Sequence, residues 1–157
     1  MNYHDRAMGD IKVAKLLLSP SGNPSNDEVL IDCAAYHTQQ AVEKELKYIL
    51  HDLLGVDDTT PAFKTHRIAD IIVSIEEQGY QIPDSIKEIA HDLTEWESSS
   101  RYNSDIVAEH NEISSAIGKY DELVDTANSI ENELEQIEND ISNDDYDIDN
   151  DFDDFER

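Results

Sequence analysis

Residues 33–50 have the sequence CAAYHTQQAVEKELKYIL, which predicts one unbroken helix. Proline and glycine are absent from residues 27–54, and the strong helix formers Ala, Glu, Gln, Leu and Lys dominate. Apolar side chains recur at three-, four- and seven-residue steps, so they share one face of the helix. The members of this face are Ile31, Ala35, Val42, Leu46, Ile49 and Leu53. We therefore expect the other helices to pack around this one.

The opposite side of the same helix carries a polar stripe, formed by His37, Gln40, Lys44, Lys47 and His51. The whole chain has 37 acidic against 11 basic side chains and a net charge of −26. Against that background, a row of amide and cationic groups is a candidate site for a ligand or an acidic partner. Periodicity alone favours a second interpretation, in which the stripe is the solvated face of an amphipathic helix. The sequence leaves both interpretations open.

The rest of the chain predicts four further helices separated by turn-forming residues. Three of them cover residues 2–18, 65–79 and 83–97, and the last begins near Asp105. The cluster SPSGNPSN ends the first helix, and Gly55 ends the central one. Residues 98–104 are expected to form a non-helical segment between the last two helices. The predicted N-caps are Ser25 or Asn26, Thr65 and Ser104.

The last helix has apolar residues at strict seven-residue intervals. These are Ile106, Ile113, Tyr120, Ala127, Leu134 and Ile141. Heptads over this length exceed what a small bundle needs, so we expect part of the helix to pair with a second copy of the chain in a homodimer. The side chains expected at that contact are Ile106, Ile113, Ile117 and Tyr120.

These elements together predict an all-α fold, an antiparallel up-down bundle of four core helices plus a long C-terminal helix. The bundle is expected to occupy residues 1–142. Residues 143–157 are rich in Asp and nearly without cations, so we expect them to form a disordered acidic tail.

Composition excludes several classes of function. Phosphate binding needs clustered Lys and Arg, so the acidity argues against a DNA- or RNA-binding protein and against anionic membrane surfaces. No apolar run approaches the roughly 20 residues that span a bilayer. Cys33 is the only cysteine, which rules out an internal disulfide and fits a reducing cytosol. Residues 1–5 lack the basic start of a signal peptide, so a cytoplasmic location is expected.

Part of the central helix resembles the second-helix signature of a known family. The pattern is Tyr36-His37-x-Gln39-Gln40-Ala41-x-Glu43-Lys44-x-Leu46-Lys47. Pro61, Thr65-His66 and Arg101-Tyr102 follow in the order seen in the same family. Over residues 1–130 the chain therefore resembles the HEPN domain, the "higher eukaryotes and prokaryotes nucleotide-binding" family.

The resemblance implies an accessory or regulatory subunit that binds a nucleotide or a small nucleotidyltransferase partner, as in toxin–antitoxin-like systems. The candidate ligand-binding residues are His37, Gln40, Lys44, Lys47, Arg101 and Tyr102. Arg101 has two interpretations of equal weight, ligand contact or neutralisation of Glu95 or Glu97. Two other functions stay open, a helical protein–protein interaction module without a small-molecule ligand and a diverged HEPN ribonuclease.

Several HEPN proteins are ribonucleases that use an arginine followed, after four to six residues, by a histidine. The arginine holds the phosphate, and the histidine exchanges a proton near neutral pH. Here eight residues separate Arg101 from His110, and Asp105 and Glu109 add negative charge. The motif does not carry over, so we expect no RNA cleavage. We interpret His110 as a hydrogen-bonded core or interface residue.

The sequence gives little support for a metal site, a cofactor site or another catalytic centre. His66 follows Thr65 and is interpreted as a capping or loop-packing residue. Residues 145–156 place acidic side chains at the ligand positions of an EF-hand loop, but an Asp-rich tail matches that pattern easily and the exiting helix is missing. A Gly-rich phosphate loop and the CxxC, HExxH and GxSxG motifs are absent from the sequence. We therefore expect no metal and no cofactor.

Overall fold

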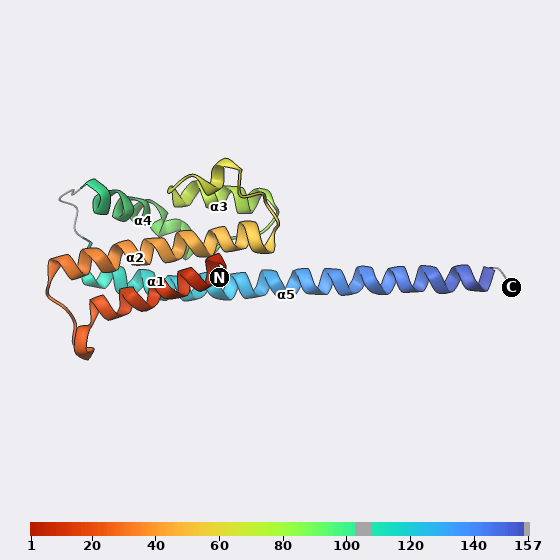
Figure 1. The fold of residues 1–157 in the computed structure, drawn as a ribbon, viewed down its shortest axis with the longest axis horizontal. Coiled ribbons are helices and arrows are strands. Elements are labelled where there is room, and N and C mark those ends of the chain that lie inside the picture. Colours follow the sequence, from red (N-terminus) through yellow and green to blue (C-terminus); the bar gives the residue numbers. More distant parts are fainter. Residues whose placement is uncertain (103–107, 156–157) are drawn as a thin grey trace.

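The computed structural model describes residues 1–102 and 108–155, with side chains described for residues 1–98 and 108–144. This part of the protein is all-α and contains no strand. Its helices form the expected bundle, with four core helices and a long C-terminal helix (Figure 1). Their bounds are α1 Tyr3–Leu18, α2 Glu28–Lys47, α3 Ile68–Glu77, α4 Asp84–Tyr102 and α5 His110–Phe155.

The central helix is α2, which contacts α1, α3, α4 and α5. The predicted apolar face is confirmed, because Ala35, Val42 and Leu46 of α2 and Ile49 just beyond it are at most 4% exposed. The two end members of the face, Ile31 and Leu53, are partly buried against the same core. This face lies within one continuous core that includes side chains of all five helices. α2 is therefore the element through which most of the bundle is held together, as its apolar periodicity predicted.

The ends of α2 differ in how well the sequence predicted them. Its N-cap is Asp27, and not Ser25 or Asn26, because the Asp27 carboxylate accepts from the N–H groups of Val29 and Leu30. Ser25 instead accepts a hydrogen bond from the N–H of Asp27 at 3.1 Å. A carboxylate at this position also meets the positive end of the helix dipole, which favours Asp as the cap.

The predicted stop at Gly55 is confirmed. Beyond Lys47 the helix continues as a π-helical segment, η2, over Tyr48–Leu53. Gly55 then takes a φ of +72°, a left-handed conformation that costs glycine little. The N–H of Val56 donates to the carbonyl of Leu50 at 3.0 Å, which closes the helix end.

The first N–H group of α3 is bound by a side chain of α4, and not by the predicted N-cap Thr65. A short 3₁₀ turn, η3, covers Pro61–Phe63 and leads into this region. Thr65 Oγ1 accepts from the N–H of Arg67 at 3.1 Å, so it stabilises the turn before the helix. The N–H of Ile68 donates to Thr94 Oγ1 on α4 at 3.2 Å. The loop before α3 is thereby tied to the middle of α4.

The predicted break at residues 98–104 is wrong where the structure describes it, because α4 runs on to Tyr102. Serine is tolerated here because its hydroxyl can bond back to the preceding turn, and Ser98 Oγ donates to the carbonyl of Thr94 at 3.3 Å. The predicted cap Ser104 lies outside the described residues. α5 begins at His110, later than the predicted start near residue 105.

The first part of α5 belongs to the core of this chain. Ile113, Ile117 and Tyr120 are buried against the bundle, so the surface expected to form a homodimer is occupied within one protomer. Ile106, named for the same contact, lies outside the described residues. The reason is topological, because α5 returns along α2 and α4 and covers them with its apolar stripe. Homodimerisation itself stays a prediction, but a dimer could not use these buried side chains as its contact.

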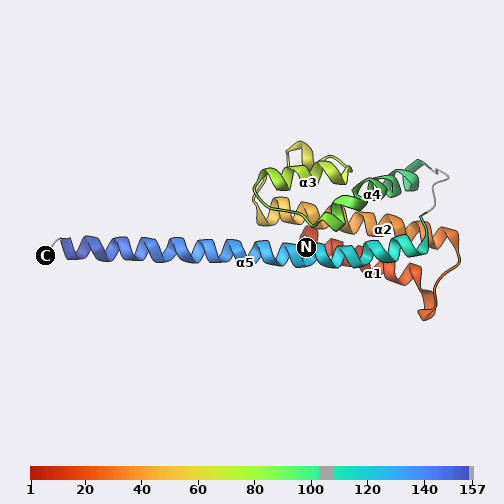
Figure 2. The same ribbon diagram turned by 180° about the vertical axis from the view of Figure 1, so that it is seen from behind.

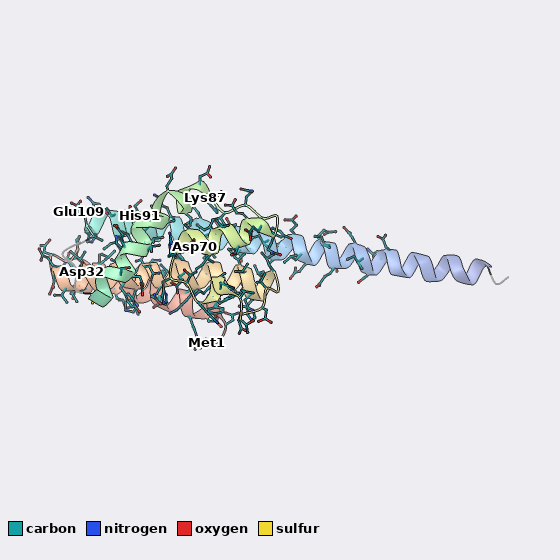
Figure 3. The ribbon with its side chains drawn as sticks, turned by 90° about the horizontal axis from the view of Figure 1, so that it is seen from above. Met1, Asp32, Asp70, Lys87, His91 and Glu109 are labelled. Atoms are coloured by element: carbon teal, nitrogen blue, oxygen red, sulfur yellow. The ribbon has the colours of Figure 1, made fainter. Side chains whose placement is uncertain are left out.

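Beyond Ile130, the last buried residue among the described side chains of α5, the helix leaves the bundle and projects alone (Figures 1 and 2). In the view from above, no other helix lies beside the projecting part (Figure 3). The helix continues to Phe155, whereas the sequence led us to expect disorder from residue 143. Glycine and proline are both absent after Gly118, so no residue type in this segment breaks a helix. Within the described residues, no helix has the length and apolar character needed to cross a membrane.

Candidate functional site

Polar side chains of α2 gather in three separate clusters, each around one carboxylate. The predicted polar stripe is therefore divided. Neighbouring elements lie on several sides of α2, and each forms hydrogen bonds with different residues of the stripe. We name the clusters after their carboxylates: the Glu43 cluster, the Asp10 cluster and the Glu45 cluster.

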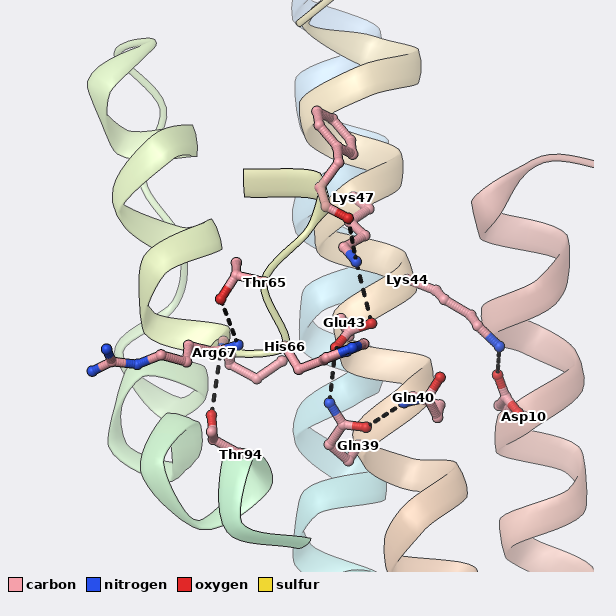
Figure 4. A network of polar contacts seen from close by, with 12 residues as sticks. Asp10, Gln39, Gln40, Glu43, Lys44, Lys47, Thr65, His66, Arg67 and Thr94 are labelled. Carbon is pink, nitrogen blue, oxygen red and sulfur yellow. Dashed lines mark hydrogen bonds and ion pairs between the residues drawn. The ribbon is translucent and has the colours of Figure 1, made fainter. Parts of the chain in front are cut away.

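The Glu43 cluster lies where α2 meets the loop before α3 (Figure 4). Glu43 is only 4% exposed, and its carboxylate accepts from Gln39 Nε2 at 3.1 Å and from Lys47 Nζ at 3.3 Å. Lys47 is 7% exposed and also donates to the carbonyl of Phe63 at 3.3 Å. Gln40 Nε2 donates to Gln39 Oε1 at 2.7 Å. Two predicted ligand residues, Gln40 and Lys47, thus belong to one buried hydrogen-bond network.

His66 brings the loop into this cluster. Its Nδ1 lies 3.0 Å from Glu43 Oε1, while its side chain is 41% exposed. A carboxylate can only accept, so Nδ1 must carry the proton, either in the neutral ring or in the imidazolium. The bond to Glu43 therefore fixes the tautomer and orientation of a histidine at the protein surface. This contact joins the loop before α3 to α2, and the N-cap position of α3 is Arg67, not His66. The loop-packing role of His66 stays a prediction.

The Asp10 cluster joins α1 to α2. His37 Nδ1 lies 2.8 Å from Asp10 Oδ1, and Lys44 Nζ donates to Asp10 Oδ2 at 2.5 Å. All three side chains are partly buried. The structure therefore brings His37 and Lys44 together, but it separates them from Lys47. Both cations of the predicted stripe already have a carboxylate partner.

The Glu45 cluster lies in the interior between α1, α2 and α5. Glu45 is fully buried, His4 Nδ1 lies 2.9 Å from both of its carboxylate oxygens, and the Tyr120 hydroxyl donates to Oε2 at 3.4 Å. Burial raises the pKa of Glu45, an effect that the contacts with His4 and Tyr120 oppose. Burial and the adjacent Glu45 also raise the pKa of Tyr120. Glu45 and Tyr120 are buried and His4 covers them from the surface, so we interpret this cluster as structural.

Arg101, Tyr102 and His110 are the remaining residues that the sequence singled out, and they lie near the junction of α4 and α5. Arg101 and Tyr102 form the last turn of α4, not a loop, and their side chains lie outside the described residues. His110 begins α5, where its Nε2 lies 3.2 Å from the carbonyl oxygen of Leu18 and its Nδ1 lies 3.5 Å from Ser114 Oγ. The hydrogen-bonded role expected for His110 is confirmed. These contacts join the end of α1 to the start of α5.

Sequence reasoning missed the three carboxylates that organise these clusters. Glu43 stood within the quoted signature, and its four-residue spacing from Gln39 and Lys47 was a usable signal. Asp10 and Glu45 offered none, because their partners lie on other helices. Among the described residues, no three His, Cys, Asp or Glu side chains gather in a way that could hold a metal ion. The candidate calcium loop has its side chains outside that part of the chain.

Comparison with known proteins agrees with this architecture. The HEPN domain family model matches residues 3–130, from the first residue of α1 to Ile130, the last buried residue among the described side chains of α5. No curated protein and no solved structure matches the chain. Because the family match covers well over half of the chain and every buried core residue that the structure describes, this protein belongs to the HEPN domain family.

Proposed function

We propose that this HEPN-domain chain is a non-nuclease accessory subunit that acts by binding a partner protein. The partner class is a small nucleotidyltransferase of a toxin–antitoxin-like system, which is what the family resemblance implies. The observation that carries the proposal is the hydrogen bonding of His110, the histidine that follows Arg101 in the chain.

Both ring nitrogens of His110 are used within the bundle. A carbonyl oxygen only accepts, so Nε2 must donate its hydrogen to Leu18 at 3.2 Å. In the neutral ring, Nδ1 is then the acceptor for the Ser114 hydroxyl. A histidine that exchanges a proton with RNA needs a nitrogen within reach of the substrate. The bonding of His110 supports a structural role at the junction of α1 and α5.

A protein partner also fits the charges of α2 better than a free nucleotide does. Lys44 is paired with Asp10, and Lys47 is buried against Glu43. A nucleotide phosphate would have to displace these carboxylates and would approach a chain of net charge −26. This supports binding through polar and apolar surface, not through phosphate contacts.

The non-nuclease half is tested by incubating the purified chain with structured and single-stranded RNA. We expect no cleavage above the buffer blank, and His110→Ala should lower thermal stability without changing that result. Asn111→Ala, at an exposed neighbouring position, is the matched control. Cleavage that disappears in His110→Ala or Arg101→Ala, with helicity intact by circular dichroism, would overturn the proposal.

The partner half is tested by co-expressing the chain with nucleotidyltransferases encoded beside it. We expect a complex of defined stoichiometry by light scattering. A chain that elutes alone in every such co-expression would contradict this half of the proposal, whatever the RNA assay gives.

Nucleotide binding along α2, across the Glu43 and Asp10 clusters, is a second candidate, favoured by the oriented, exposed ring of His66 beside Glu43. Lys44, Lys47 and Arg101 are the cations proposed to hold phosphate. Calorimetry with ATP, GTP and AMP tests this, with Lys44→Ala expected to weaken binding more at low salt than at high salt. Lys12→Ala, an exposed cation on α1, is the control. Absence of heat with the unmodified protein would remove this candidate.

A further inference from the structure

The projecting part of α5 carries an apolar row that the described part of the chain covers only at its first member. We call this row the distal stripe and define it as Leu134, Ile137 and Ile141. Leu134 is partly buried at the edge of the bundle, whereas Ile137 is 45% and Ile141 is 56% exposed. Single exposed apolar residues are ordinary, but three at spacings of three and four share one helix face.

The distal stripe continues the seam that packs α5 into the bundle. Earlier members of the same heptad are buried, at the a positions Ile113, Tyr120 and Ala127 and at the d positions Ala116, Leu123 and Ile130. Leu134, Ile137 and Ile141 are the next a, d and a positions of that seam. The heptad thus extends past the last buried residue, into a region where no helix of the described chain lies beside α5. Its pattern is that of a helix that packs against a further helix.

The flanking charges decide which helix fits. Positions e and g beside the distal stripe are Glu131, Glu133, Glu138 and Asp140, all exposed. Lys, Arg and His are all absent between Lys119 and Arg157. In a helix pair, e and g residues of the two chains lie opposite one another, and like charges there are unfavourable. A second copy would set carboxylates against carboxylates in either orientation.

We propose that the distal stripe docks a cationic amphipathic helix of a partner protein, with apolar a and d positions flanked by Lys or Arg. The apolar side chains would cover Ile137 and Ile141, and the cations would pair with the flanking carboxylates. The site lies outside the segment matched by the family and outside the bundle. The inference goes beyond the proposed function and does not depend on a nucleotidyltransferase or on RNA.

The probe is a synthetic helical peptide with Leu and Ile at a and d and Lys at e and g. Two control peptides have Glu at e and g, or the composition of the Lys peptide in scrambled order. Binding to the full chain is measured by fluorescence anisotropy at low salt. We expect the Lys peptide to bind, and both controls to bind about tenfold more weakly or not at all.

Variants of the chain test the surface itself. Ile137→Asn with Ile141→Asn should weaken binding of the Lys peptide about tenfold or more, because the apolar contact is lost. The matched control is Leu16→Asn with Val73→Asn, at exposed apolar positions elsewhere, which should leave binding unchanged. Glu133→Lys, Glu138→Lys and Asp140→Lys together should reverse the preference toward the Glu peptide.

Three outcomes would overturn the inference. The first is the absence of binding by the Lys peptide. The second is equal binding of the scrambled peptide, which would show attraction by charge alone. The third is a dimer of the unmodified chain that Ile137→Asn with Ile141→Asn abolishes, which would make a second copy the occupant. None of these results bears on RNA cleavage or on a nucleotidyltransferase complex, so the two proposals fail separately.

Discussion

Glu43 and Glu45 stand two residues apart on α2, yet their carboxylates meet different elements. Glu43 binds Lys47 and the loop histidine His66, while Glu45 meets His4 and Tyr120 from α1 and α5. Burying a charge is costly unless it is paired and hydrogen-bonded, and both carboxylates have at least two partners. These residues therefore fix which neighbouring segment lies on which side of α2.

The Glu43–Lys47 pair gives the first prediction. Glu43→Ala leaves the buried ammonium of Lys47 with the Phe63 carbonyl and without its carboxylate, so we expect a loss of about 3 kcal/mol in the free energy of unfolding. Glu43→Leu combined with Lys47→Met removes both charges and should cost less than the single change. Urea unfolding measures both, with the exposed Glu112→Ala as control. A double variant less stable than Glu43→Ala would show that the pair adds net stability.

Glu45 gives a prediction about pH. Burial raises its pKa above the ordinary value of 4.5, so the folded state holds the proton more tightly than the unfolded state. The stability from this group is therefore present below pH 4.5 and lost as the pH rises through the folded-state pKa. Glu45→Gln cannot titrate, so unfolding free energies of the two proteins should diverge across that window, with the unmodified protein losing stability as pH rises. A constant difference would contradict the prediction.

At the scale of elements, periodicity predicted the helices well and their ends poorly. The apolar face of α2 and the stop at Gly55 followed from local sequence, because both depend on residues within a few positions. The start of α3 did not, since its first N–H is bound by Thr94 of α4. The sequence also could not predict the division of the polar stripe, because Asp10, which binds His37, belongs to another helix, α1. Local pattern cannot specify a partner supplied by tertiary packing.

The two parts of α5 should contribute very differently to stability. Among the described side chains the last buried one is Ile130, so we expect that deleting residues 137–157 removes little core and changes the unfolding free energy by less than about 1 kcal/mol. Leu123→Ala, a fully buried position on the same helix, should cost about 3 kcal/mol. Urea unfolding of both proteins makes the comparison. A large loss on truncation would mean that the projecting helix packs against the bundle or against another chain.

For the whole molecule, the dominant property is a net charge of −26, which is carried by the bundle and by the strongly acidic segment after Ile130 together. In the clusters, some carboxylates are paired with Lys44, Lys47 or His66. These basic groups are therefore not available to pair with the acidic side chains on the surface. Most acidic side chains therefore face solvent among other acidic side chains, and their repulsion opposes the compact state. The same repulsion disfavours encounter with RNA and favours a cationic partner.

This repulsion makes a last prediction about salt. Raising NaCl from about 0.01 M to about 1 M shortens the Debye length from about 30 Å to about 3 Å, so repulsion between surface carboxylates is screened. We expect the Tm to rise by about 4 °C or more, equivalent to about 1 kcal/mol, in a calorimetric scan. NaCl is preferred to sulfate, because sulfate also strengthens apolar burial. Changing Asp121 and Asp125, exposed on α5, to their amides should raise the Tm at low salt and reduce the response. A Tm that falls with NaCl would show that attractive pairs such as Lys44–Asp10 outweigh the net repulsion.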